Sequence, residues 1–200
     1  MKLSYEIAKE INIVRTNPKR YYKILDNYQK NFENQTIFKL PYLETGIKTK
    51  EGKEGFEEAM NYLETLNKIS PLKPIISLFK IAENYLLEIQ KIEYKKIVDI
   101  NIEDIIKKYG TFYGNFSRIV NFGYNDPELI ICNFLISDGD KNRNERKCLL
   151  NDKFFYFGVA FGEHEMFGYC TVVVFCTDFK SKNIIDDNEI DIENFENEEN

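Results

Sequence analysis

Apolar residues in the first part of the chain recur with the period of an amphipathic helix. The first stripe is Ile7, Ala8, Ile11 and Val14, and the second is Tyr21, Tyr22, Leu25 and Tyr28. Ser4 precedes the first stripe and is a residue type that caps helix N-termini. Between the stripes, Thr16-Asn17-Pro18 is expected to end one helix and start the next, because proline fits the first helical turn.

Further helices are predicted in the middle of the chain. Residues 31–55 are polar and contain Pro41, Gly46, Gly52 and Gly55, so we expect a long loop. Two more stripes at helical spacing follow: Phe56, Ala59, Met60, Leu63 and Leu66, then Leu78, Ala82, Tyr85, Leu86 and Ile89. Residues 93–108 are rich in Ile and charge, and their pattern fits either a helix or an extended segment.

The last third of the chain combines one helix with two strands. Asp126-Pro127 is expected to start a helix whose inner face is Ile130, Ile131, Phe134 and Leu135. The aromatic and β-branched runs near 154–162 and 169–178 predict strands, joined by a hairpin loop at 162–168. Helices followed by antiparallel strands indicate an α+β sandwich.

Composition and charge divide the chain into a body and a tail. The 200 residues, 43% of them apolar, suffice for one domain with a real core, which we place at residues 1–182. The segment 186–200 holds eight acids and no Lys or Arg, which leaves residues 1–185 with a net charge of +2 out of a total of −6. Residues 183–200 are therefore an acidic tail, and the nearly neutral body favours no nucleic-acid groove.

The N-terminus and the cysteines indicate a reducing compartment. Residues 1–6 lack the apolar stretch of a signal peptide, and no run approaches the ~18 apolar residues of a membrane span. Cys132, Cys148, Cys170 and Cys176 form no CxxC pair. Cys170 and Cys176 are expected on one strand, about 20 Å apart at ~3.3 Å per residue, too far for a disulfide. We expect buried thiols and a cytoplasmic protein, with the cilium or cytoskeleton as possible sites.

A family resemblance is carried by the segment from Gly139 to Gly168, GDKNRNERKCLLNDKFFYFGVAFGEHEMFG. It resembles the signature of the CAP superfamily (cysteine-rich secretory, antigen 5 and pathogenesis-related 1 proteins). Ile13-Val14-Arg15-x-x-Pro18-x-x-Tyr21 resembles the family's first-helix region, and Pro71-Leu72-Lys73-Pro74 its Pro-Leu-x-Trp step. Gly46–Gly52 resembles an insertion of protist members. The resemblance covers about residues 5–180 and is most specific at 138–162.

The resemblance implies a CAP-type α-β-α sandwich with a small antiparallel sheet between helical layers. It also implies that residues 109–123 form a loop and a short strand. The family's central cleft is usually built from two His and two Glu, which can hold a divalent metal and assist proton transfer. Aligned on the motifs, those positions are Tyr85, Gly114 and Glu145, with Asp138 loosely at the fourth. The resemblance therefore implies a degenerate site.

The remaining candidates for chemistry are few. His164 is the only histidine, so one chain has no two-His metal site, and we expect no metal, no other cofactor and no catalysis. His164 is predicted to be an exposed loop residue, and Tyr85 to fill the core or the cleft. Glu145 is predicted to pair with Arg143, Arg146 or Lys147. Asp138-Gly139-Asp140 is typical of a turn and lacks the last ligand of a calcium loop.

Three functions remain open. The first is a non-catalytic structural or adaptor subunit of a larger assembly, ciliary or cytoskeletal, since the Lys-, Asn- and Ile-rich composition resembles that of ciliate proteins. Its tail would either solubilise the protein or dock on a protein partner through Ile190, Ile192 and Phe195. The second is a protein that binds lipid or a small apolar ligand, as some CAP proteins do. The third is a hydrolase.

Overall fold

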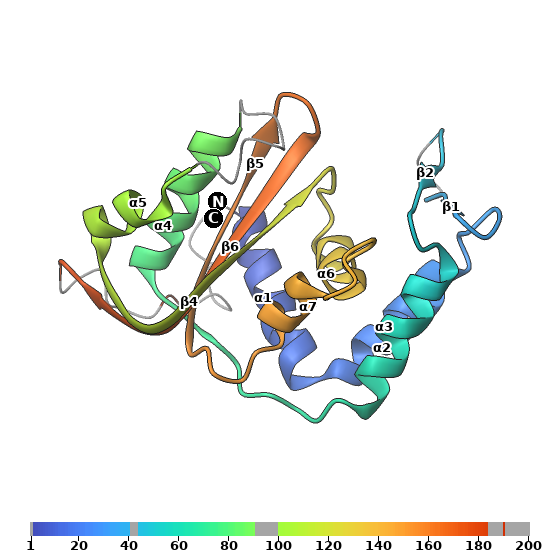
Figure 1. Cartoon of the computed structure of the whole chain (residues 1–200), viewed down its shortest axis with the longest axis horizontal. Coiled ribbons are helices and arrows are strands. Elements are labelled where there is room, and N and C mark those ends of the chain that lie inside the picture. The colour runs from blue at the N-terminus through green and yellow to red at the C-terminus, as the bar shows by residue number, and fades with distance from the viewer. Residues whose placement is uncertain (1, 41–43, 91–99, 184–189, 191–200) are drawn as a thin grey trace, which may run out of the picture.

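The computed structural model describes residues 2–40, 44–90, 100–183 and 190. The helices are α1 (Lys2–Thr16), α2 (Pro18–Gln29), α3 (Lys53–Thr65), α4 (Ile76–Ile89), α5 (Ile102–Tyr109), α6 (Pro127–Ile136) and α7 (Asn144–Leu149). The strands are β1 (Ile37–Phe38), β2 (Ile47–Lys48), β3 (Lys73–Pro74), β4 (Gly110–Phe122), β5 (Tyr156–His164) and β6 (Gly168–Ser181). Figure 1 shows the long strands between two groups of helices.

The main sheet has the order β3-β5-β6-β4. β6 lies antiparallel between β5 and β4, while the two-residue β3 runs parallel to β5 at the other edge. The predicted α+β sandwich with a small antiparallel sheet is confirmed for the three long strands. The parallel β3, which follows the Pro71-Leu72 step, was not predicted.

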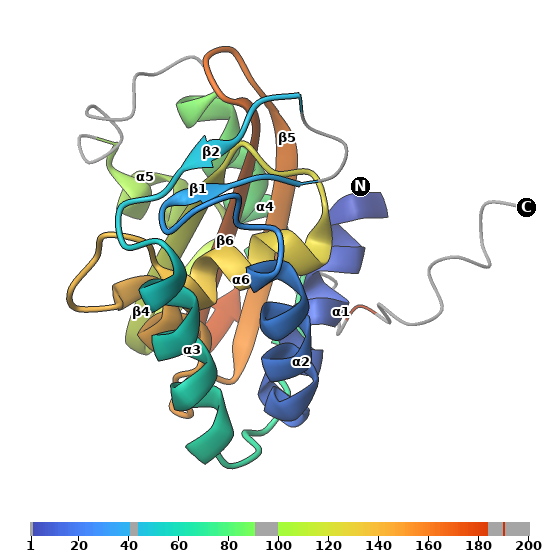
Figure 2. The same cartoon turned by 90° about the vertical axis from the view of Figure 1, so that its right-hand side faces the viewer.

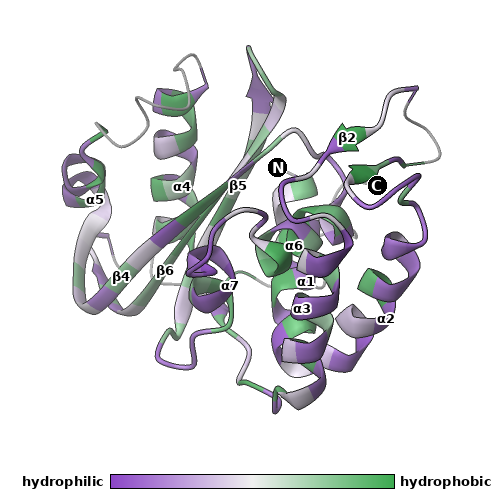
Figure 3. Cartoon of the chain, turned by 45° about the vertical axis from the view of Figure 1, so that its right-hand side comes forward, coloured by the Kyte–Doolittle hydropathy of each residue, from purple (hydrophilic) through white to green (hydrophobic). Residues whose placement is uncertain are grey.

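Side chains alternate between the two faces of the sheet, and each face has its own core. Val173 and Phe175 face the layer of α1, α2, α3 and α6, whereas Val172 and Val174 face α4 and α5. Alternation with both faces buried explains the continuous apolar run of β6. In Figure 3 the central strands are largely hydrophobic in colour, whereas α7 is largely hydrophilic.

Gly158 on β5 sets the contact between α4 and the sheet. A Cβ added at this glycine would lie 2.1 Å from the carbonyl carbon of Leu78 and 2.3 Å from the nitrogen of Phe79. Because both are backbone atoms, no side-chain rotation could relieve the overlap. α4 therefore sits closer to β5 than any other residue type at position 158 would permit.

The segment between α2 and α3 is more ordered than the predicted loop. β1 and β2 form a small antiparallel hairpin, and Phe32 bridges to Phe38. Phe32, Phe38 and Phe56 pack together with ring centroids 5.2 to 5.5 Å apart, which attaches the hairpin to the start of α3. Figure 2 shows the hairpin at one end of the α2 and α3 pair.

Most predicted helical stripes are confirmed. Ile7, Ala8, Ile11 and Val14 are fully buried, as are the predicted inner residues of α6. α1 and α2 meet at Asn17, with Pro18 in the first turn of α2. The Asp126 side chain caps α6 by accepting the Leu129 N–H at 2.9 Å.

Two local predictions were wrong. Ser4 is not a cap, because α1 already includes Lys2; instead its Oγ accepts the backbone N–H of Phe161 at 3.1 Å, which ties α1 to β5. Residues 110–122 are not a loop with a short strand but a 13-residue strand paired along most of β6. β5 and β6 also begin and end a few residues away from the predicted bounds.

Arg15 is completely buried and joins three segments. Its guanidinium donates to the backbone carbonyls of Ser70 at 3.0 Å, Leu149 at 2.8 Å and Asn151 at 3.0 Å. Burial lowers the pKa of Arg15 to about 10. The residue that marks the first-helix motif is therefore a structural clamp.

The four cysteines are buried and free, and Cys170 and Cys176 lie on β6 as predicted. Burial raises the pKa of each thiol. Within the described part of the chain, no helix is both long and apolar enough to cross a bilayer.

Candidate functional site

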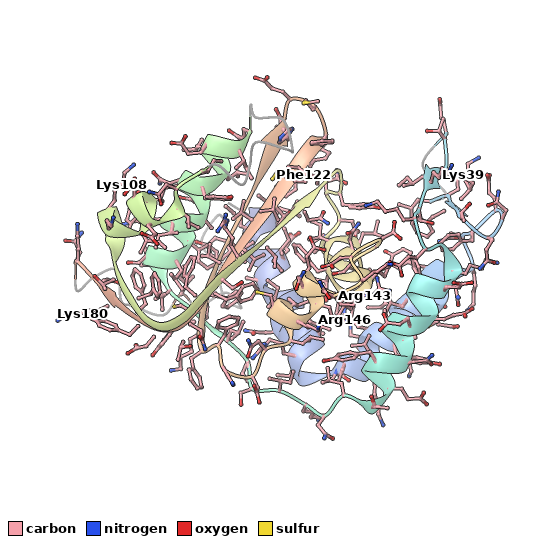
Figure 4. The ribbon with its side chains drawn as sticks, in the orientation of Figure 1. Lys39, Lys108, Phe122, Arg143, Arg146 and Lys180 are labelled. Atoms are coloured by element: carbon pink, nitrogen blue, oxygen red, sulfur yellow. The ribbon has the colours of Figure 1, made fainter. Side chains whose placement is uncertain are left out.

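A cleft of about 360 Å³ opens between the end of β4 and the β1–β2 hairpin. Its floor is α6, and one side is closed by the turn that leads into α7. The lining is Tyr28, Phe38, Ile47, Lys48, Thr49, Lys50, Gly52, Phe56, Val120, Asn121, Phe122, Tyr124, Leu129, Cys132, Asn133, Ile136, Asp138 and Glu145. In Figure 4 the labelled Phe122 and Lys39 lie on opposite sides of this region, on β4 and next to the hairpin.

A reciprocal set of hydrogen bonds fastens the hairpin to the turn after α6. The Asp138 carboxylate accepts the backbone N–H groups of Lys50 at 2.7 Å and Glu51 at 2.8 Å. In return, Glu51 Oε1 accepts the Gly139 N–H at 2.7 Å. The insertion-like segment and the most family-like segment therefore build one wall of the cleft together.

Two arginines extend this connection to α3. Arg143 pairs with Glu51 through both guanidinium NH2 nitrogens and contacts Glu58 through Nε at 3.2 Å. Arg146 donates to both carboxylate oxygens of Glu58, at 2.7 and 2.6 Å, and lies over the Tyr62 ring. Figure 4 shows both arginines on the side of α7 that faces α3. We call Glu51, Glu58, Asp138, Arg143 and Arg146 the polar latch.

Glu145 points into the cleft from the first turn of α7. Its predicted pairing with a neighbouring cation is wrong: no ion pair of Glu145 occurs among the described residues, because Arg143 and Arg146 turn to Glu51 and Glu58. Glu145 Oε2 instead lies 3.2 Å from Ser137 Oγ. Burial raises the pKa of Glu145 to about 7, although the Ser137 hydroxyl lowers it.

The way in which Ser137 serves Glu145 depends on the protonation of the carboxyl. Its Oγ also lies 3.0 Å from the Phe134 carbonyl oxygen, which can only accept a hydrogen bond. A hydroxyl has one proton, so Ser137 cannot donate to both oxygens at once. A protonated Glu145 donates to Ser137 Oγ, which then donates to Phe134, and all three groups are satisfied.

Asn121 brings a second polar group to the cleft from β4. Its side chain is 5% exposed, and its Oδ1 has no hydrogen-bond partner in the described structure. Leaving a buried amide oxygen without a partner costs on the order of 1–3 kcal/mol. A ligand with an N–H or O–H group would remove that cost.

The predicted site positions separate into two groups. Asp138 and Glu145 line the cleft together. Tyr85 is fully buried among the residues of the α4 layer, on the other face of the sheet, where Arg118 lies 5.0 Å above its ring. Gly114 sits at a bulge of β4, with φ of +77°, and does not line the cleft. Tyr85 thus fills the core as expected.

The prediction for His164 was wrong. The residue ends β5 and is only 3% exposed, packed between the rings of Phe122 and Phe167 at centroid distances of 5.1 and 4.9 Å. Its Nδ1 accepts the Met166 N–H at 3.1 Å, and its buried Nε2 has no partner in the described structure. The imidazole therefore shapes the β5–β6 turn.

The C-terminal tail is described only at Ile190. The Ile190 N–H donates to the Pro74 carbonyl of β3 at 2.9 Å, and its side chain packs on the core. This residue contacts its own chain, whereas the sequence suggested a partner contact. Ile192 and Phe195 lie outside the described residues, and so does most of the proposed tail 183–200.

Sequence reasoning did not single out Val120, Asn121 or Phe122, the β4 residues that line the cleft. A polar residue between apolar neighbours in a strand was the available signal. Among the described residues, no group of three or more His, Cys, Asp or Glu side chains is arranged to hold a metal ion.

The comparisons with known proteins add little to this geometry. No family model matches the chain, and no curated protein matches it. A solved cysteine-rich secretory protein from Staphylococcus aureus is similar with a TM-score of 0.40 and 20% identity, over 62% of this chain and 37% of that one. The chain thus spans little more than a third of that protein, and a likeness of this size carries no argument about activity.

Proposed function

We propose that the protein is a non-catalytic, CAP-like binding module that joins a larger assembly by taking a group of its partner into the cleft. The observation that carries the proposal is the cleft itself, which Asn121 and Glu145 both line, and in which Glu145 is mostly protonated below neutral pH. Both groups are suited to hydrogen bonds with a ligand.

The surroundings of Glu145 support binding over catalysis. Nucleophilic catalysis pairs a nucleophile with an adjacent base that a third group usually orients. The hydrogen-bond partner of Glu145 in the described structure is a serine hydroxyl that also lies next to a backbone carbonyl. The one imidazole of the chain is held by Phe122 and Phe167 at the β5–β6 turn and does not line the cleft.

The test is affinity purification of the tagged full-length protein from its own cells, with Lys48→Trp as the cleft variant. Lys48 is exposed and lines the cleft, so a tryptophan there fills the opening without removing core contacts. Lys39→Trp is the matched control, since Lys39 follows β1 on the same hairpin and does not line the cleft.

We expect a stoichiometric partner with the wild type and with Lys39→Trp, and loss of that partner with Lys48→Trp. A partner recovered equally with both variants would place the contact elsewhere. A version lacking residues 184–200 is purified in parallel, because a partner lost only with the tail would assign the contact to the tail.

A second candidate function is the binding of a small apolar ligand. It is favoured by the aromatic and aliphatic share of the lining, such as Phe38, Phe56 and Ile136. Native mass spectrometry of protein purified from its own cells separates the two. A retained small mass that Lys48→Trp removes would support the ligand, and protein free of added mass would count against it.

A further inference from the structure

The register of β4 determines which of its backbone groups face the cleft. β4 is the outer strand of the sheet on that side. The Gly123 N–H donates to the Tyr169 carbonyl at 2.9 Å, and Phe122 is the Cα partner of Cys170. In an antiparallel pair, residues alternate between pointing both backbone groups at the neighbour and pointing both away. The backbone N–H and C=O of Asn121 therefore point toward β6, whereas those of Val120 point outward, away from the sheet.

Val120 thus presents a free donor and a free acceptor at the wall of the cleft. It lines the cleft and is half-buried. Its outward N–H and C=O make no hydrogen bond with any residue that the structure describes. Backbone groups of an outer strand in this state are a template for another strand.

The opposite wall and the floor fit a single chain better than a folded sheet. Residues 47–50 of the hairpin face this stretch of β4 across the cleft, and α6 closes the bottom. A cleft of about 360 Å³ between β4 and the hairpin suits one extended chain better than a second folded sheet. The rings of Phe38, Phe56 and Tyr124 offer an apolar site for one of its side chains.

We propose that the cleft receives an extended peptide segment of a partner protein, which adds to the outer edge of β4 at Val120 as an extra strand. The inference rests on the function proposed above and names the chemistry of the group that is bound. A peptide supplies an acceptor for the Val120 N–H, a donor for its C=O, and an N–H or polar side chain for Asn121. An acyl chain would cover these groups without pairing them, at an unfavourable desolvation cost.

Proline substitution tests strand addition directly. Val120→Pro removes the N–H that would bond the peptide, and it breaks no bond to β6 because that N–H points away. Arg118→Pro is the matched control. Arg118 lies two residues before Val120 on β4, its backbone N–H points outward in the same way, and it does not line the cleft. The folding of both variants is checked by urea unfolding, since Arg118→Pro also removes the contact above Tyr85.

The probe is a displayed library of random decapeptides selected on the full-length protein, with enriched peptides synthesised for fluorescence anisotropy. We expect Val120→Pro to weaken their binding about tenfold, the effect of one hydrogen bond of ~1.4 kcal/mol, and Arg118→Pro to change it less than twofold. If Val120→Pro does not fold, hydrogen exchange on the wild type replaces it. Bound peptide should then slow exchange of the Val120 amide at least tenfold.

The other outcomes overturn the inference in distinguishable ways. Some outcomes would separate cleft binding from strand addition. Peptides whose binding is lost in Lys48→Trp, but is not weakened by Val120→Pro and does not slow exchange of the Val120 amide, would occupy the cleft without adding a strand. The proposed function would then stand without this inference. A library that yields no cleft-binding peptide would also overturn strand addition. A concentration-dependent dimer abolished by Val120→Pro would assign the edge to a second copy of this chain.

Discussion

The two faces of the sheet are held in different ways. On the α4 face, Val172, Val174 and Cys176 are fully buried in an apolar layer, and Gly158 lets the backbone of α4 approach β5. On the other face, the cleft wall depends on the polar latch, whose carboxylates and guanidinium groups join α3, the hairpin and α7.

The difference assigns separate tasks to the two faces. Apolar packing depends little on pH or salt, whereas charged hydrogen bonds near the surface depend on both. We therefore expect the α4 face to keep its packing across pH and salt, and the cleft wall to loosen where these conditions weaken the polar latch. Variants of each face should show these contrasting behaviours.

The largest effect is expected from Gly158→Ala on the scaffold face. The added Cβ meets backbone atoms of Leu78 and Phe79, so α4 must move away from β5. We expect a loss of about 3 kcal/mol in the free energy of unfolding, at the upper end for overpacked cores. Urea unfolding at two pH values should give the same loss at both.

Gly168→Ala is the control for glycine substitution itself. Gly168 has φ of +78°, but an added Cβ would have nothing within 4 Å. The expected cost is the conformational strain alone, about 1 kcal/mol. An equal loss for the two glycines would show that the close approach of α4 contributes nothing.

Arg15→Leu tests the junction below the cleft face. The variant leaves the carbonyls of Ser70, Leu149 and Asn151 without their donor, but it also removes a buried charge. We expect a net loss of about 2 kcal/mol in the free energy of unfolding, since each abandoned acceptor costs roughly 1 kcal/mol or more. Arg20→Leu, on the exposed side of α2, should lose less than half as much in the same urea titration.

Glu145→Gln should increase the free energy of unfolding at high pH, whereas the preceding variants decrease it. The ordinary pKa of a Glu carboxyl is 4.5, and in the fold that of Glu145 is about 7. The folded state thus holds a proton that the unfolded state releases, and this carboxyl lowers stability progressively from pH 4.5 to 7. At pH 8 we expect the glutamine variant to be more stable by about 2 kcal/mol.

The same comparison at pH 4.5 is the internal control for Glu145. There the carboxyl is protonated in the fold and resembles the amide, so the two proteins should unfold at nearly the same urea concentration. Glu165→Gln, at an exposed position of the β5–β6 turn, should show no such pH-dependent gain. A glutamine variant that is less stable at every pH would contradict the raised pKa.

The scaffold was more predictable from the sequence than the cleft. Helical stripes such as Ile7 to Val14, and the apolar run of β6, record local periodicity that burial on one or both faces enforces. The cleft depends on partners far apart in the chain. Arg143 lies next to Glu145 in sequence, yet it pairs with Glu51, 92 residues away.

His164 and β4 illustrate the same limit. His164 is buried because Phe122 and Phe167 converge on it, and its position in an apparent turn gave no sign of this. β4 was underestimated because its outer residues are half exposed and polar, so the alternation that marks a strand is weak there. The unpaired edge at Val120 follows only from the register with β6.

The smallest effect is expected from Glu51→Gln, which weakens the polar latch. The hydrogen bond from Arg143 is the main cause that lowers the pKa of Glu51 below its ordinary value. A carboxyl with a lowered folded pKa stabilises the protein above its unfolded pKa of 4.5, and this stabilisation is lost as pH falls through the folded value. We expect the variant to lose about 1 kcal/mol at pH 7, and progressively less below pH 4.5.

Hydrogen exchange locates this change on one face of the sheet. The Lys50 amide donates to Asp138 within the latch, so Glu51→Gln should speed its exchange, more so in high salt. The amide of Val173, in the centre of the sheet, should exchange only as fast as the lower global stability requires. Glu54→Gln, on the exposed side of α3, should leave the Lys50 amide unchanged. Equal acceleration at Lys50 and Val173 would mean that the cleft wall and the scaffold open as one unit, and the contrast between the two faces would then be wrong.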